Sequence, residues 1–405
     1  MKKLYTIALS ALLAGTATAA ELDLTTPQLR TLDFKGITTE VQSAQAGVET
    51  FATRGARMAA QQAPTRVPES AIVDKNYQLE GYGRLFGEQT EGLAVLGVTE
   101  IIKEDGQLKY GPFLFDGLYF NASYDPASMT LTVPAGQTVT ITEEGNSYDL
   151  TLYNYSFEDG KAHDIMFTYY PEERLFFYEA GVDAENYYTE CIVLAQASAE
   201  VGSGVYGQLF VAYNFMVNSV MSETAIDDQG NVGDATLYNI YVEQKGDKII
   251  VDNMFNFGFA AHPEFTLDAQ AKTLSATQPV LYQGSDGTIS MLGVDEAGYT
   301  TETVVFSQNA TTDAFIFQTA AVALTDGSQI EPAYVPMFRV PFDPYAGAGV
   351  QGVAVDDANA PVEYFNLQGV RVSNPENGLY IRRQGNKLEK IIIRKAPTMN
   401  PQRAL

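Results

Sequence analysis

The stretch "IMFTYYPEERLFFY" (residues 165–178) holds the pattern that decides the fold class. Two runs rich in aromatic residues flank a short polar turn that contains a proline, which is typical of two antiparallel strands joined by a turn. Similar short apolar runs, separated by Gly, Asp, Asn or Pro turns, recur from Tyr77 to Arg339, and no long helical period interrupts them. The sequence therefore predicts an all-β body of antiparallel strands.

The body also contains an internal repeat. The same pattern returns as "VVFSQNATTDAFIFQ" (residues 304–318), and two further blocks return in the same order. The matches align Gly106 with Gly246, Asp125 with Asp268, Leu131 with Leu274, Phe167 with Phe306 and Phe176 with Phe315. A unit of about 140 residues is too long for a solenoid repeat and has the size of a whole domain. We expect two related β domains, residues 76–205 and 206–340, joined within residues 196–215, each a sandwich or a small barrel.

The amino terminus has the three parts of a secretory signal peptide. Lys2 and Lys3 precede an apolar run that is too short to span a bilayer, and Ala17-Thr18-Ala19 is a small-residue cleavage site. We therefore predict that residues 1–20 are a signal peptide and that the exported chain has no membrane-spanning segment. Residues 21–75 are poor in aromatic residues, which predicts a partly disordered or helical segment without a core of its own.

Charge is distributed unevenly along the chain. The 50 Asp and Glu outweigh the 25 Lys and Arg, for a net charge of −25. This balance excludes nucleic acid as an expected partner, because phosphate binding requires a basic surface. The sign reverses at the end, where residues 362–405 contain eight Lys or Arg and three Glu.

No group of residues has the spacing of a catalytic, cofactor or metal site. The two histidines, His163 and His262, lie in different repeats, and the chain has no serine-hydrolase elbow, zinc-binding His-Glu-x-x-His or phosphate-binding glycine loop. Cys191 lies in an alternating apolar stretch, so we expect it to be a buried hydrophobic residue. The polar loop 227–234 lacks the register of a calcium loop. We therefore predict no catalytic residue, no cofactor and no metal.

Tyrosines gather in the first repeat, and some of them are candidates for a contact surface. Tyr169, Tyr170, Tyr187 and Tyr188 form two adjacent pairs. Tyrosine joins an apolar ring to a polar hydroxyl, so these residues suit contacts with a glycan or a protein. The alternative is that they pack in the core or on the face of a sheet.

The chain ends in a small basic module that follows a linker. Residues 341–361 are rich in Gly, Ala and Asp, which predicts a linker. "VEYFNLQGVRV", "LYIRRQG" and "KLEKIIIR" predict three strands within residues 362–395, followed by a tail at 396–405. Three short strands are close to the lower limit of independent stability.

This module resembles the C-terminal sorting-type domain of type IX secretion cargo. The matching residues are Tyr364, Asn366, Leu367, Gly369, Arg371, Gly378, Tyr380, Gly385, Lys390 and residues 391–394. The resemblance implies export to the cell surface, the outer membrane or the medium, with export or surface-anchoring machinery as the partner of residues 362–395. Family members usually stop at the final basic strand, whereas this chain continues to Leu405.

The body, over about residues 77–335, resembles the tandem calycin-like, lipocalin-like β domains of secreted proteins. The shared residues are Asp125, Thr130, Leu131 and 133–137. We expect an exported, non-catalytic binding or adhesion-type protein with a glycan or protein ligand. Two alternatives remain open. A β-sandwich glycan hydrolase requires two carboxylates from different strands on a concave face, flanked by tyrosines. A lipocalin-like carrier requires an apolar cavity in at least one repeat.

Overall fold

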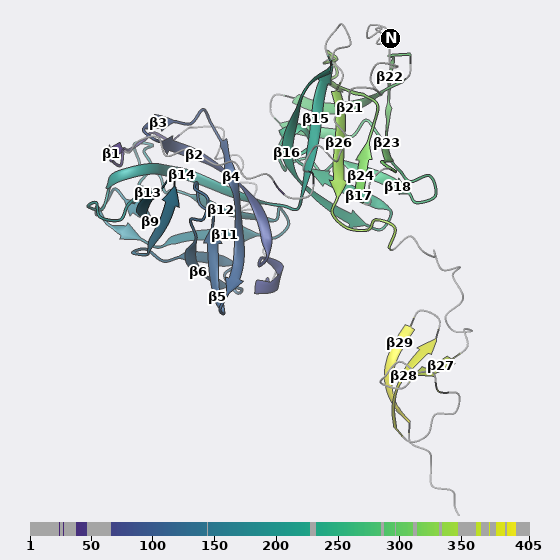
Figure 1. Cartoon of the computed structure of the whole chain (residues 1–405), viewed down its shortest axis with the longest axis horizontal. Coiled ribbons are helices and arrows are strands. Elements are labelled where there is room, and N and C mark those ends of the chain that lie inside the picture. The colour runs from purple at the N-terminus through teal and green to yellow at the C-terminus, as the bar shows by residue number, and fades with distance from the viewer. Residues whose placement is uncertain are drawn as a thin grey trace, which may run out of the picture. The chain divides into compact units, whose positions relative to one another are not determined.

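The computed structural model describes residues 24, 27, 38–46, 66–143, 145–226, 232–284, 287–295, 297–310, 314–331, 334–346, 362–365, 372, 378–384 and 387–393. The predicted signal peptide 1–20, the tail 396–405 and most of the predicted linker 341–361 lie outside the described residues. The chain divides into two compact units, Met1–Asp343 and Pro344–Leu405 (Figure 1). The larger unit contains both predicted β domains, and each of them is a closed antiparallel barrel.

The first barrel and its attached strands span residues 75–217. The elements are β2 (Lys75–Leu85), β3 (Glu88–Gln89), β4 (Ala94–Glu104), β5 (Gln107–Gly111), β6 (Phe120–Asp125), β7 (Thr130–Val133), β8 (Thr138–Glu143), β9 (Asn146–Ser156), β10 (Ala162–His163), β11 (Ile165–Tyr170), β12 (Leu175–Glu179), β13 (Glu190–Gln196) and β14 (Ser203–Val217). A short 3-10 helix, η2 (Glu69–Ala71), precedes them. The order β2-β4-β5-β6-β7-β11-β12-β14 closes where β14 pairs with β2.

The second barrel follows directly after Asn218. Its elements are β15 (Ser219–Ile226), β16 (Val232–Lys245), β17 (Lys248–Asp252), the 3-10 helix η3 (Met254–Asn256), β18 (Glu264–Asp268), β19 (Thr273–Thr277), β20 (Val280–Gly284), β21 (Gly287–Val294), β22 (Thr300–Thr301), β23 (Thr303–Gln308), β24 (Phe315–Gln318), β25 (Val322–Thr325) and β26 (Tyr334–Val340). The order β15-β16-β17-β18-β19-β23-β24-β26 closes where β26 pairs with β15.

The two barrels share the same pairing scheme, which confirms that the body consists of two related β domains. In both barrels, three extra strands precede the sixth barrel strand in sequence: β8–β10 in the first barrel and β20–β22 in the second. One more extra strand, β13 or β25, precedes the last barrel strand. These four extra strands pair with one another, and we call them the flap. Individual residues also correspond, because Leu131 pairs with Phe167 in the first barrel and Leu274 pairs with Phe306 in the second. Asp125 and Asp268 each end the strand before the equivalent turn.

Two details of the predicted repeat were wrong. Register in the sheets aligns Phe176 with Phe317 instead of Phe315, because the connection from β23 to β24 is two residues longer than the connection from β11 to β12. The predicted junction within 196–215 falls inside β14, which continues to Val217 and pairs with β2, β12 and β13 of the first barrel. The first barrel therefore ends at Val217 and not at residue 205.

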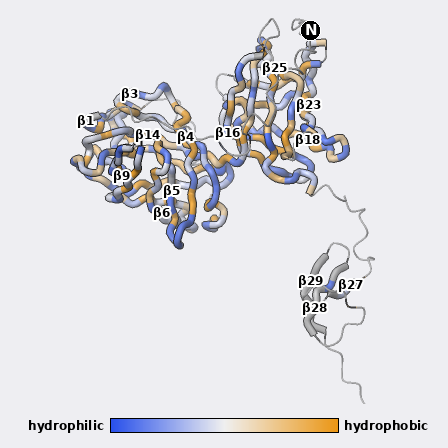
Figure 2. Tube along the Cα trace, in the orientation of Figure 1, coloured by the Kyte–Doolittle hydropathy of each residue, from blue (hydrophilic) through white to orange (hydrophobic). Residues whose placement is uncertain are grey.

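Aromatic side chains fill the interiors of both barrels. Along β11, Ile165, Phe167 and Tyr169 are buried while Met166 and Thr168 are exposed, as the alternating pleat requires. The Tyr110 and Phe167 rings lie 5.4 Å apart in the first barrel, and Phe306 and Phe338 lie 5.1 Å apart in the second. Figure 2 shows the resulting alternation of apolar and polar residues along the strands. Barrels of this strand number are just wide enough for side chains to fill.

Part of segment 21–75, which was predicted to be helical or disordered, forms a β-strand in the structure. Residues Thr38–Glu40 form β1, which extends the sheet by pairing with Val205 and Ser203 of β14. Further along, the Tyr188 amide donates to Ala44 O at 3.0 Å, and the Ala46 amide donates to Asn186 O at 2.7 Å. We call residues 38–46 the strap, because they connect β14 to the loop that follows β12.

The smaller unit contains a separate antiparallel sheet. Its strands are β27 (Val362–Phe365), β28 (Gly378–Gln384) and β29 (Lys387–Ile393), in the order β27-β28-β29. The predicted three-stranded C-terminal module is thus confirmed as a fold element, while its role in sorting stays a prediction.

Candidate functional site

The sheet of the first barrel forks at β14. One edge of β14 pairs with β2 over residues 207–217. Its other edge pairs with β12 over residues 211–215 and with β13 over residues 205–209. β12 continues into the barrel wall through β11, whereas β13 continues into the flap through β9. The wall and the flap therefore diverge from a shared strand, and a groove opens between them.

The groove has a volume of about 390 Å³ and is open to solvent. Its lining combines carboxylates, aromatic rings and one exposed thioether: Asn154 from β9; Asp164, Met166, Thr168 and Tyr170 from β11 and the residue before it; Phe177, Tyr178 and Glu179 from β12; and Glu190 from β13. No Lys, Arg or His is among these residues. A half-enclosed surface with one sign of charge concentrates its field on an incoming ligand of the opposite sign.

A chain of hydrogen bonds fixes one of the carboxylates. The buried Tyr178 hydroxyl donates to Asn154 Oδ1 at 2.9 Å, and Asn154 Nδ2 donates to Glu190 Oε2. The Gly181 amide donates to the other oxygen, Glu190 Oε1, at 3.4 Å. Burial raises the pKa of Tyr178 well above its ordinary value, so the hydroxyl keeps its proton and remains a donor. Glu190 is therefore held in place before any ligand arrives.

Glu179 is different, because its carboxylate has no hydrogen-bond or ion-pair partner among the described residues. It is half-buried, and burial raises its pKa above the ordinary value. Asp164, the third carboxylate, accepts a hydrogen bond from the Ala135 amide at 2.9 Å. Glu179 is thus the acceptor in the groove that a ligand can satisfy.

Exposed apolar side chains lie in the groove and on the loop that connects two of its carboxylates. Met166 is 59% exposed, and Val182 and Tyr187 are 46% and 41% exposed. Val182 and Tyr187 lie on the loop 180–189, which connects Glu179 to Glu190 and which the strap holds through Ala44 and Ala46. We call this loop the rim, because it joins Glu179 to Glu190, and the strap holds it in place.

The second barrel lacks these features at the equivalent positions. The pairing registers align Asn154 with Leu292 and Asp164 with Thr303. The long connection 180–189 corresponds to residues 319–321, a Thr-Ala-Ala sequence without a carboxylate. Among the described residues, the carboxylates of the groove thus have no counterparts at the equivalent positions of the second barrel.

The four predicted contact tyrosines do not form one surface. Tyr169 and Tyr188 are only 4% and 3% exposed, packed against Phe176 and Phe210 with ring centroids 4.6 and 4.7 Å apart. They belong to the core, which corrects their prediction as contact residues. Tyr170 lines the groove and Tyr187 lies on its rim loop. In each adjacent pair, one tyrosine points to the core and the other points away from it. The sequence alone does not show which tyrosine of a pair is buried.

The residues of the sorting-type motif lie in or near the three-stranded module. Tyr364 is in β27, Gly378 and Tyr380 are in β28, and Lys390 is in β29. Asn366, Leu367, Gly369, Arg371 and Gly385 lie outside the described residues.

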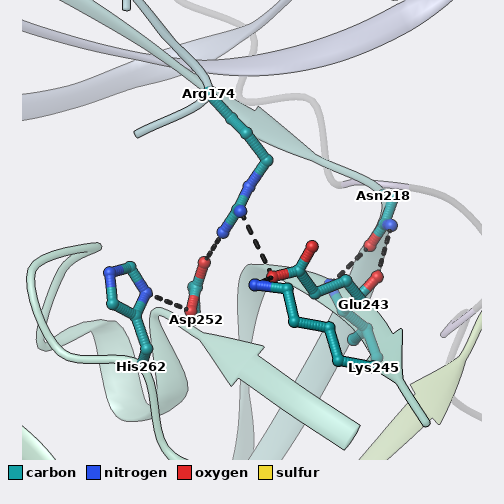
Figure 3. A network of polar contacts seen from close by, with 7 residues as sticks. Arg174, Asn218, Glu243, Lys245, Asp252 and His262 are labelled. Carbon is teal, nitrogen blue, oxygen red and sulfur yellow. Dashed lines mark hydrogen bonds and ion pairs between the residues drawn. The ribbon is translucent and has the colours of Figure 1, made fainter. Parts of the chain in front are cut away.

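A second polar cluster joins the two barrels (Figure 3). Arg174, in the turn after β11, pairs with the buried Asp252 at the end of β17 and with Glu243 of β16, 3.4 Å away. His262 Nδ1 lies 2.9 Å from Asp252 Oδ1, and Lys245 Nζ lies 2.7 Å from Glu243 Oε1. All these charges have partners within the cluster. Such a cluster fixes the arrangement of the barrels rather than binding a ligand.

The linking residue and an aromatic stack complete this junction. Asn218 binds both backbone groups of Val242, with Nδ2 donating to Val242 O and Oδ1 accepting from Val242 N, each at 2.8 Å. The rings of Phe215 and Phe259, one from each barrel, stack at 4.4 Å. The junction therefore combines polar contacts with apolar burial.

The remaining candidates show no site of their own. Cys191 is buried, as predicted, and burial raises the pKa of its thiol. Within the described residues, no group of three or more His, Cys, Asp or Glu side chains is placed to hold a metal ion. Most of the predicted polar loop 227–234 lies outside them. In the same part of the chain, no helix is long and apolar enough to cross a membrane.

Comparison of the chain with protein-family models, with curated proteins and with solved structures finds no match in any of the three.

Proposed function

We propose that this protein is an exported, non-catalytic binding protein of the cell surface or the extracellular space, and that its ligand site is the groove between the wall and the flap of the first barrel. The observation that carries the proposal is the specialisation of one copy of a duplicated fold. Three carboxylates and three aromatic rings line a groove in the first barrel, while the second barrel has Leu292 and Thr303 at the positions equivalent to Asn154 and Asp164.

Support for export comes from the sequence. The signal-peptide pattern of residues 1–20 and the sorting-type likeness of residues 362–395 imply passage through the inner membrane and delivery to the outer surface. Export or surface-anchoring machinery is the partner proposed for the C-terminal module, and a glycan or a protein is the ligand proposed for the groove.

A glycan hydrolase is the second candidate, because one observation favours it. Glu179 and Glu190 come from different strands, line the same groove and lie beside Tyr170 and Tyr178. A glycosidase needs a protonated acid and an ionised carboxylate in one site, and burial raises the pKa of Glu179 in the direction an acid requires. The lipocalin-like carrier has no such support, since aromatic rings occupy both barrel interiors.

The proposal is tested with a panel of immobilised oligosaccharides and peptides and the mature chain, residues 21–405. Met166→Arg places a long cationic side chain in the groove, and Val305→Arg is the matched control, because Val305 occupies the equivalent exposed position of the second barrel. We expect a panel compound whose binding is lost in Met166→Arg and kept in Val305→Arg. Binding that survives Met166→Arg would place the ligand site elsewhere.

The same panel separates binding from hydrolysis. Each oligosaccharide is incubated with the protein and followed for new reducing ends. A binding protein returns the oligosaccharides intact. Turnover that Glu179→Gln abolishes would establish the hydrolase instead.

A further inference from the structure

The residues that line the groove indicate the chemical class of its ligand. This inference rests on the proposed function. Asp164, Glu179 and Glu190 contribute negative charge, and no basic side chain lines the groove to neutralise it. An anionic ligand would therefore enter against repulsion. A ligand with a positive charge would enter with the field.

Glu179 is the group that such a charge would meet. Glu190 already accepts from Asn154 and from the Gly181 amide, and Asp164 accepts from the Ala135 amide. Glu179 has no partner among the described residues, although burial has removed part of its water shell. A half-buried carboxylate without a partner gains most from a charged hydrogen-bond donor, because such bonds are stronger than neutral ones.

Apolar groups beside the carboxylates suit the carbon part of the same ligand. The Tyr170 and Phe177 rings lie 6.3 Å apart and both line the groove, as does the exposed Met166. Lysine and arginine side chains carry an apolar stem behind a charged head, and a guanidinium also stacks on aromatic rings. The groove therefore offers a contact for each part of a basic side chain.

We propose that the groove binds a lysine or arginine side chain of a partner polypeptide. The rim supports a polypeptide rather than a free cation, because Val182 and Tyr187 expose further apolar surface on the loop that links Glu179 to Glu190. Residues flanking the basic side chain can pack along this rim. The strong net negative charge of the chain, −25, adds long-range attraction for a basic partner.

The test is isothermal titration of the mature chain with a capped heptapeptide of alternating glycine and basic residues. A second heptapeptide has glutamine at the three basic positions, and a glucosamine tetramer supplies a cation on a sugar. Glu179→Gln keeps the shape of the side chain and removes its charge. Glu158→Gln is the control, because Glu158 is exposed and does not line the groove.

We expect the basic peptide to bind, the glutamine peptide to bind at least about tenfold more weakly, and Glu179→Gln to weaken the basic peptide by about tenfold, the range for losing a charged hydrogen bond. Glu158→Gln should bind like the parent. Equal binding of the two peptides, no binding of the basic peptide, or no effect of Glu179→Gln overturns the inference. A groove-dependent response to the glucosamine tetramer alone overturns the polypeptide partner but leaves the groove as the ligand site. Loss of the proposed function itself would appear as insensitivity of every panel compound to Met166→Arg.

Discussion

The guanidinium carbon of Arg174 lies 4.2 Å from the centroid of the Tyr241 ring, so a side chain of the first barrel is stacked on the second. The same guanidinium pairs with Asp252, which is only 1% exposed. A charge buried to this degree depends on its partners for stability. Arg174 thus couples the two barrels through ion pairs and a ring contact.

Replacing Arg174 should destabilise the body. We expect Arg174→Ala to lower the free energy of unfolding by about 3 kcal/mol, because it leaves the buried Asp252 carboxylate with His262 as its remaining side-chain partner. Urea unfolding followed by tyrosine fluorescence measures the change. Lys161→Ala is the control, since Lys161 pairs with Asp159 on the surface and should change stability by less than about 0.5 kcal/mol. Equal effects of the two substitutions would contradict a structural role for Arg174.

Stability should also depend on the protonation of His262. The hydrogen bond to Asp252 raises the pKa of this histidine above its ordinary value of 6.5. A group with a raised pKa in the folded state stabilises the fold below its unfolded pKa, and this contribution is lost as the pH rises through the folded pKa. The protein should therefore lose part of its stability between mildly acidic and mildly alkaline pH.

The difference between the parent and His262→Gln isolates this effect from the titration of other groups. Free energies of unfolding from urea titrations between pH 5.5 and pH 8.5 should converge as the pH rises, with a gap at low pH of less than about 1 kcal/mol, because His262 is half-exposed. Parallel pH profiles of the two proteins would show that His262 does not contribute.

The buried side chain of Asn214 should contribute to the stability of the first barrel through its hydrogen bonds. Asn214 is 1% exposed, and its Oδ1 accepts hydrogen bonds from Thr99 Oγ1 at 3.0 Å and from the Tyr110 hydroxyl at 2.8 Å. Asn214→Leu should cost about 2 kcal/mol, because it leaves buried donors unsatisfied. Adding Tyr110→Phe should restore part of the loss, since it removes one orphaned hydroxyl. A double variant as unstable as the sum of the single variants would contradict this coupling.

Deletion of residues 362–405 should relocate the protein without unfolding its body. Among the described strands, β27, β28 and β29 pair with one another, and the body closes its own two barrels. The thermal midpoint of the body should stay within about 2 °C of the parent. Fractionation of cells into periplasm, surface and medium measures location. An unchanged distribution would contradict a sorting role, and a collapsed melt would contradict the independence of the module.

The repeat was predictable because its signals are local. Asp125 and Asp268 end strands before turns, and Leu131 and Leu274 alternate with polar neighbours in the strands that follow. The junction between the barrels was predicted at the wrong place, because no local signal marks it in the sequence. β14 is buried almost throughout, and it has neither an alternating pattern nor a strong turn signal before Asn218.

The groove was not predictable from local patterns. Glu179 and Glu190 flank one loop, but Asn154 and Asp164 reach the same site through different strands. Their meeting depends on the fork at β14, where β12 and β13 share one edge of a strand. The strap was also missed, because its pairing with β14 joins residues that are far apart in sequence, such as Thr38 and Val205.

The most direct test of the account is carbodiimide labelling of carboxyl groups in the mature chain, with and without the basic heptapeptide, followed by peptide mass spectrometry. The account predicts that the peptide protects Glu179 and the neighbouring groove carboxylates. Labelling of the exposed Glu158 and of Glu302 in the second barrel should be unchanged. Protection centred on the second barrel or the C-terminal module, with Glu179 still labelled at its free rate, would contradict the groove of the first barrel as the ligand site.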